Sequence, residues 1–220
     1  MHIKDTALGA LAELGYPQQK IKTAQARQLS ATLYRQLADH QIESVLHLCE
    51  QLLEERDWML SLIAYDWAFR VKKQYTLSTF DIFECWLLHY VTDWYDCDDF
   101  CTHAFGELIV QYPQLIDKTH HWATHSNFAV RRAVAVILIY PLNKGKSPLN
   151  APLNAANLLF NDQHDLVQKG YGWLLKVLSK SSPDVVINYL KTHHKHMPRV
   201  AFRYALEKLD KQTKAQLMSL

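Results

Sequence analysis

The stretch ATLYRQLADHQIESVLHLCEQLLEE, residues 31–55, decides the fold class, because its apolar residues recur at three- and four-residue spacing. This spacing places apolar side chains on one face of a helix. The apolar positions are Leu33, Leu37, Val45, Leu48 and Leu52. They form two stripes separated near Asp39 and His40, so we predict two amphipathic helices joined by a short connection.

The same spacing continues through most of the chain, which has only six glycines and no Asn-Gly or Asp-Gly hairpin signal. We therefore predict an all-α protein, an α-α superhelix of degenerate HEAT-like helix pairs in one domain over residues 1–220. The expected helices lie near residues 5–15, 24–38, 41–54, 57–71, 79–91, 95–111, 114–124, 128–140, 152–160, 163–179, 184–194, 199–209 and 211–219. The longest expected loop runs from Pro141 to Asn154.

Charge is distributed unevenly between the two halves of the chain. Residues 1–110 contain 9 Lys+Arg and 16 Asp+Glu, a net charge of −7, whereas residues 111–220 contain 15 and 6, a net charge of +9. A basic half favours contact with a polyanion such as a nucleic acid. Two other interpretations remain: the halves attract each other, or their compositions differ only by drift.

No apolar run is long enough to span a membrane, and residues 1–19 lack the apolar core of a signal peptide, so we expect a cytoplasmic protein. The four cysteines include no CxxC pair. Cys97 and Cys101 share a helical face, which fits a reduced, packed pair better than a zinc site. The histidine-rich stretches 118–125 and 191–196 lack the HExxH spacing, so we predict no metal and no cofactor.

The segment DWYDCDDFC, residues 93–101, gathers four carboxylates within seven residues beside two aromatic rings. In a helix, Trp94 and Asp98 lie one turn apart on one face, and Tyr95 and Asp99 do the same. A face that offers an indole and a carboxylate can stabilise a cation. The alternative is a solvated acidic helix start, where aspartates interact favourably with the helix dipole.

The segment SNFAVRRAVAVILIYPL, residues 126–142, combines an apolar run with two adjacent arginines. Arg131 and Arg132 point about 100° apart on a helix, so they cannot face the same way. A buried guanidinium needs water, a carboxylate or a phosphate. We expect one arginine to pair with an acidic neighbour and the other to meet a phosphate at the rim of a concave surface.

The segment VQKGYGWLLKVL, residues 167–178, carries Gly170 and Gly172 inside a helical pattern. Glycine in a helix interior costs roughly 1 kcal/mol relative to alanine, so these two positions need a reason. They permit either close packing of two helices or the approach of a ligand to the Trp173 ring.

These three segments, in this order, resemble the DNA alkylation repair glycosylases of the AlkD-like, HEAT-like repeat family. Residues 93–101 resemble its Trp-xxx-Asp segment, and WATHSNFAVRRAVAV (122–136) resembles its Trp-x-x-Ser-x-Asn-x-Trp-x-x-Arg helix start. VQKGYGWLLKVLSKSSPDVVINYL (167–190) is similar to its Lys-Gly-x-Gly-Trp-x-Leu-Arg/Lys segment, and MPRVAFRYALEKL (197–209) to its closing helix. The resemblance is strongest from about Glu54 to Leu209.

The resemblance implies a concave, basic groove for double-stranded DNA and excision of cationic N3- and N7-alkylated purines by hydrolysis of the N-glycosidic bond, in base excision repair. It assigns Asp98 as the catalytic aspartate, Trp94 and Trp173 as its aromatic partners, and Arg132 as an active-site arginine that clamps a phosphate. A one-residue shift would substitute Tyr95 and Asp99. Arg131 is then a structural or solvated arginine. The basic residues expected near DNA are Arg131, Lys144, Lys146, Lys169 and Lys176.

The chain departs from the family pattern at three positions. Ala129 stands where an aromatic residue is common, Tyr95 where a second tryptophan often follows the first, and Lys176 where an arginine is common. The alternative function is therefore a non-catalytic HEAT-like module that binds nucleic acid or another protein. We expect a monomer in either case.

Overall fold

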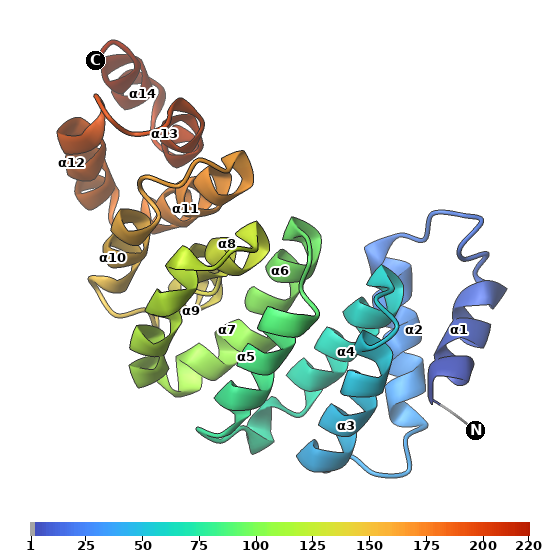
Figure 1. The fold of residues 1–220 in the computed structure, drawn as a ribbon. Coiled ribbons are helices and arrows are strands. Elements are labelled where there is room, and N and C mark those ends of the chain that lie inside the picture. The colour runs from blue at the N-terminus through green and yellow to red at the C-terminus, as the bar shows by residue number, and fades with distance from the viewer. Residues whose placement is uncertain (1–2) are drawn as a thin grey trace.

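The computed structural model describes residues 3–220, which fold into helices and loops without a β-strand (Figure 1). The helices are α1 (Ile3–Glu13), α2 (Thr23–Arg35), α3 (Ile42–Leu53), α4 (Trp58–Arg70), η1 (Lys72–Gln74), α5 (Thr79–His89), α6 (Trp94–Cys101), α7 (Ala104–Gln111), η2 (Pro113–Thr124), α8 (Phe128–Val136), α9 (Ile139–Asn143), α10 (Ala151–Leu158), α11 (Asp165–Leu178), α12 (Pro183–His193), α13 (Arg199–Leu206) and α14 (Lys211–Met218). The all-α prediction is confirmed.

The helices stack into a curved array that runs from α1 at one end to α14 at the other (Figure 1). Within it, α3 packs on α4, α8 on α11 and α11 on α13. The buried apolar side chains form one continuous cluster from Ala7 to Leu217. Its largest fully buried members near the middle of the chain are aromatic and include Trp67, Trp86, Trp122, Tyr65, Phe80, Phe83, Phe100 and Phe105. This aromatic interior fixes the helices whose ends carry the candidate site.

The helix expected over residues 95–111 is two helices, because the chain turns between Cys101 and Ala104. His103 has φ −128° and ψ −94°, outside the helical region. The turn brings Gly106 so close to Cys101 that a Cβ at Gly106 would lie 2.5 Å from the Cys101 carbonyl oxygen. Only glycine permits this approach, so the break follows from tertiary packing.

The helix expected over residues 128–140 is also interrupted. α8 ends at Val136 and α9 begins at Ile139. Pro141 explains the break, because it lacks an N–H and its ring clashes with the carbonyl four residues earlier in a continuous helix. α9 and the start of α10 at Ala151 shorten the expected loop to residues 144–150. The expected helix 114–124 is the 3-10 helix η2.

Candidate active site

Helices that are far apart in the chain meet around an open pocket of about 440 Å³. α6, α8 and α11 supply most of the lining, and α13 contributes one residue. The lining residues are Trp94, Asp98, Arg132, Leu166, Lys169, Trp173, Lys176 and Tyr204. The pocket therefore brings together all four residues predicted to be catalytic and two of the predicted DNA contacts.

α6 places an indole and a carboxylate on the pocket side. The Asp93 carboxylate accepts a hydrogen bond from the Trp94 backbone N–H at 2.7 Å and caps the helix. Trp94 is the first helical residue and is 45% exposed. Asp98 follows one turn later on the same face. Both side chains line the pocket, as the spacing of this segment predicts.

Arg132 on α8 is the partner of Asp98. Its Nε lies 2.8 Å from Asp98 Oδ1 and its Nη2 lies 2.9 Å from Oδ2, so the contact is bidentate. Its Nη1 donates to the backbone carbonyl of Leu166 on α11. Arg132 is only 5% exposed. One buried guanidinium thus joins α6, α8 and α11 behind the pocket.

Burial and the ion pair act in opposite directions on the charges of these two groups. Burial raises the pKa of Asp98, and the hydrogen bonds and charge of Arg132 oppose that rise. Burial alone would lower the pKa of Arg132, but its bonds to Asp98 raise that pKa above its ordinary value. Arg132 meets a carboxylate here, whereas the resemblance implies a phosphate. A direct phosphate contact would require the guanidinium to release Asp98.

Gly170 and Gly172 are needed for close approach between helices. A Cβ on Gly170 would lie 3.1 Å from Arg132 Cγ and 3.3 Å from Arg132 Nη1. A Cβ on Gly172 would lie 2.8 Å from the Ala201 carbonyl oxygen on α13. These contacts support the packing interpretation of both glycines. Gly170 also has a direct consequence for the site, because it leaves room for the guanidinium that holds Asp98.

The lysines at the rim of the pocket have acidic partners within the protein. Lys169 Nζ lies 2.7 Å from Asp165 Oδ2, and Lys176 forms an ion pair with Glu207. Both pairs are partly exposed to solvent, so a phosphate can compete for each ammonium group. Lys144 lies elsewhere, in the loop between α9 and α10 with Lys146, and its Nζ is 5.3 Å from the centre of the Tyr140 ring.

Two lining residues are not predicted by the sequence. Tyr204 on α13 belongs to the closing-helix segment, but no spacing rule singles it out. Leu166 contributes its backbone carbonyl to Arg132, which a side-chain pattern cannot reveal. Ala129, the position where the family often has an aromatic residue, is fully buried on α8 and does not line the pocket.

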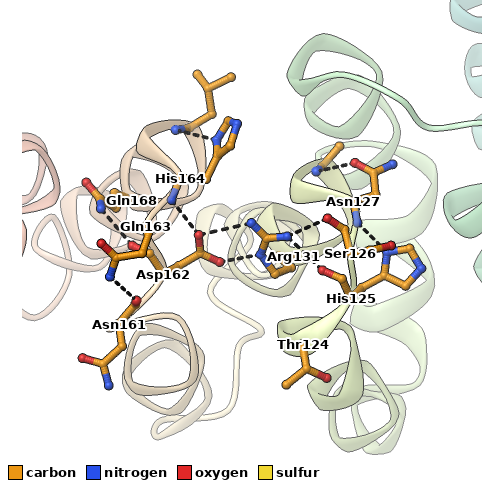
Figure 2. Close-up of polar contacts among 12 residues, drawn as sticks. Thr124, His125, Ser126, Asn127, Arg131, Asn161, Asp162, Gln163, His164 and Gln168 are labelled. Atoms are coloured by element: carbon orange, nitrogen blue, oxygen red, sulfur yellow. Dashed lines mark hydrogen bonds and ion pairs between the residues drawn. The ribbon is translucent and has the colours of Figure 1, made fainter.

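Arg131 does not line the pocket. It connects two loops (Figure 2). Its Nε lies 2.5 Å from Asp162 Oδ2, and its Nη1 donates to the carbonyls of His125 and Ser126 at 2.8 and 2.9 Å. Asp162 also accepts a hydrogen bond from the His164 backbone N–H at 2.8 Å. The expectation that one arginine pairs with an acidic neighbour is met by both arginines. Arg131 joins the segment before α8 to the segment before α11.

The alternative register, Tyr95 and Asp99, lies outside the pocket. Asp99 forms an ion pair with Arg27 on α2 and lies 3.7 Å from His103 Nδ1. Tyr95 packs edge-on against Trp58, with ring centroids 4.8 Å apart. Neither side chain lines the pocket. The geometry therefore favours the register that retains the tryptophan.

The cysteines and the acidic groups of residues 3–220 show no metal-binding geometry. Within this range no cluster of three or more His, Cys, Asp or Glu side chains is arranged to hold a metal ion. Cys97 and Cys101 are free and buried, and burial raises the pKa of the Cys97 thiol well above its ordinary value. None of the helices in this part of the chain is long and apolar enough to cross a membrane.

Comparison with known proteins places the chain in a family. Residues 19–209 match the family model of the DNA alkylation repair enzymes. No curated protein sequence matches the chain. One similar structure, described as a predicted DNA alkylation repair enzyme from Enterococcus faecalis, is 19% identical, covers 87% of each chain and has a TM-score of 0.70. AlkD2 from Streptococcus mutans is 19% identical over 94% of this chain and 99% of its own, with a TM-score of 0.65. These two structures share the fold, and the family match shows that the chain belongs to the DNA alkylation repair enzyme family.

Proposed function

We propose that this protein is a DNA glycosylase that hydrolyses the N-glycosidic bond of cationic N3- and N7-alkylated purines in duplex DNA. One observation carries the proposal. The Asp98 carboxylate is fixed by Arg132 in an open pocket that Trp94 and Trp173 also line. An anionic group in a pocket that electron-rich rings also line is an environment that stabilises a cation.

The chemistry follows from the charge of the substrate. Alkylation at N3 or N7 makes the purine cationic, so the base leaves as a neutral molecule and needs no general acid. The electron pair of the C1′–N bond departs with the base, and C1′ of the deoxyribose gains oxocarbenium character. A carboxylate near C1′ stabilises this charge. Water then adds to C1′ and loses its proton to solvent, which leaves an abasic site.

Each residue has a distinct role in this scheme. Asp98 stabilises the developing charge and positions the attacking water with the lone pairs that Arg132 does not use. Arg132 is a positioning residue, because its bidentate contact fixes both carboxylate oxygens. Trp94 and Trp173 present aromatic faces to the sugar and the departing base.

The basic residues near the pocket are proposed to bind DNA phosphates. Lys169 and Lys176 would exchange Asp165 and Glu207 for phosphate oxygens. The logarithm of the DNA-binding constant falls linearly with the logarithm of the salt concentration. Replacing either lysine by glutamine should make this slope shallower by about 0.9 for each phosphate that the protein no longer neutralises. The same measurement with variants of Lys144, Lys146 and Arg131 tests whether the duplex extends beyond the pocket to reach them.

The direct test is release of N7-methylguanine from methylated duplex DNA by the wild type and by Asp98→Asn. We expect the variant to lose about 100-fold or more in rate. Asp184→Asn is the matched control, because it removes an exposed carboxylate from the first turn of α12 and should leave the rate unchanged. Circular dichroism must show that both variants are folded.

The competing function is a module that binds DNA, or another protein, without catalysis. Wild-type protein that binds duplex DNA with a steep salt dependence but releases no base would establish the DNA-binding module. If the wild-type protein neither releases base nor binds DNA, binding to another protein is the only one of these functions that remains. Full release by a folded Asp98→Asn variant would refute the role of Asp98.

A further inference from the structure

A second pocket lies between α3 and α5, on elements that take no part in the candidate active site. Its volume is about 570 Å³, larger than the 440 Å³ of the active-site pocket. The lining residues are Ile42, Glu43, Leu46, His47, Glu50, Gln74, Thr76, Ser78, Thr79, Asp81, Ile82, Cys85 and Trp86. None of them lines the first pocket. We call this second pocket the α3–α5 groove.

The α3–α5 groove has an apolar base and an apolar side chain on one wall. Leu46 and Trp86 line it while being almost fully buried, so they form its base. The apolar side chain of Ile82 on α5 is 41% exposed and is therefore not part of the buried core. Exposed apolar surface of this kind, framed by polar side chains, is typical of sites that bind another molecule.

The charged side chains of the α3–α5 groove are carboxylates, and the imidazole of His47 also lines it. Its lining contains the carboxylates of Glu43, Glu50 and Asp81, but no lysine or arginine. Neither α3 nor α5 carries a lysine or arginine anywhere along its length. Basic side chains approach α5 from outside the groove: Lys118 Nζ lies 3.9 Å from Asp81 Oδ1, and Arg56 donates to the His89 carbonyl. The groove therefore repels DNA and attracts a cationic partner.

The spacing of the charged and apolar side chains determines which kind of partner fits the α3–α5 groove. The lining residues on α3 run from Ile42 to Glu50, which is about 12 Å along a helix axis. This length matches two turns of a bound helix. Glu43 and Glu50 stand near the two ends of the wall, and the apolar base lies between them. A helix with apolar residues on one face and a basic residue one turn to either side would satisfy all of these features.

We propose that the α3–α5 groove binds a basic, amphipathic helical segment of a partner protein. The apolar face of that segment covers Leu46, Trp86 and Ile82, and its lysines or arginines meet Glu43, Glu50 and Asp81. The groove and the active-site pocket share no residue. The partner can therefore be held while the pocket is occupied by DNA, and the inference does not depend on the proposed glycosylase activity.

The probe is a fluorescein-labelled peptide of about 14 residues, long enough to form a helix, with leucines on one face and lysines on the flanks. Fluorescence anisotropy should show saturable binding to the wild-type protein. Glu43→Gln/Glu50→Gln should weaken it about tenfold, because two ion pairs with the peptide cannot form. Glu13→Gln/Asp184→Asn is the matched control, since it removes two exposed carboxylates outside the groove and should leave the affinity unchanged.

The apolar contact is tested separately by Ile82→Ser, with Leu149→Ser as its control. Both residues are exposed, so neither change should unfold the protein, but only Ile82 lines the groove. Weaker binding by Ile82→Ser alone supports the proposal. Equal affinity of all variants, equal binding of a peptide with glutamates in place of lysines, or no binding by the wild type would overturn it. A dimer that Ile82→Ser dissociates would show that a second copy of the chain, and not a basic peptide, occupies the groove.

Discussion

Asp98 and Asp99 are adjacent in the chain, but their carboxylates belong to separate ion-pair networks on different faces of α6. Asp98 is held by Arg132 from α8 and lines the pocket. Asp99 pairs with Arg27 from α2, which also lies 3.5 Å from Asp66 on α4. Consecutive residues on a helix point about 100° apart, so one helix can present one carboxylate to a ligand and use the next to anchor itself.

The first prediction separates these two roles. Asp99→Asn should lower the free energy of unfolding by about 1–3 kcal/mol, because Arg27 loses one carboxylate but keeps Asp66. Base release by the folded variant should stay within about twofold of the wild type, since Asp99 does not line the pocket. Urea denaturation and a release assay well below the melting temperature measure the two effects. A folded Asp99→Asn protein that loses release as completely as Asp98→Asn would move the catalytic role to Asp99.

The second prediction concerns the space beside Arg132. Gly170→Ala places a methyl group 3.1 Å from Arg132 Cγ and 3.3 Å from its Nη1, so the guanidinium must shift. A small displacement of the group that fixes Asp98 should reduce base release about tenfold or more. Gly9→Ala is the matched control, because its added methyl group meets nothing within 4 Å and should stabilise α1 by about 1 kcal/mol. Unchanged release by Gly170→Ala would mean that the site does not depend on the position of Arg132.

The third prediction addresses Arg131. Arg131→Met should lower the free energy of unfolding by about 3–5 kcal/mol, because it leaves the nearly buried Asp162 carboxylate without its charged partner. Two backbone carbonyls, those of His125 and Ser126, lose their donors as well. Thermal unfolding of Arg131→Met, Asp162→Asn and the double variant gives the coupling energy of the pair. A fully stable Arg131→Met protein with a shallower salt dependence of DNA binding would instead identify Arg131 as a phosphate contact.

The fourth prediction is a pH dependence of stability. Burial raises the pKa of Asp96 to about 6, whereas an aspartate in the unfolded chain titrates near 3.9. The native state therefore binds a proton at Asp96 that the unfolded state lacks. This group stabilises the fold as the pH falls, and that contribution is lost as the pH rises through about 6.

The corresponding measurement is urea denaturation of the wild type and Asp96→Asn between about pH 5 and pH 7. The wild type should gain about 1 kcal/mol relative to the variant on acidification across this interval. The variant should be the more stable protein at pH 7, because an uncharged amide replaces a buried carboxylate. Parallel curves for the two proteins would show that Asp96 titrates at its ordinary pKa.

The local features of this protein are readable in its sequence. Apolar spacing predicts an all-helical chain, and the helix expected near residues 184–194 is α12, Pro183–His193. The spacing of Trp94 and Asp98 places both on one face of α6. Pro141 also marks the break between α8 and α9, although the apolar run around it predicts a continuous helix. Such features depend on the geometry of a single helix, which neighbouring residues determine.

Tertiary structure alone decided which groups meet. Asp98 and Arg132 are 34 residues apart, and the two arginines on α8 are equally able to bind a carboxylate or a phosphate. Because of the way α6, α8 and α11 pack, Arg132 forms an ion pair with Asp98 and Arg131 forms one with Asp162. The same packing requires a glycine at position 170. The groove between α3 and α5 arises in the same way. A helix fixes the direction of its side chains, but only the burial of apolar surface between helices determines what lies in that direction.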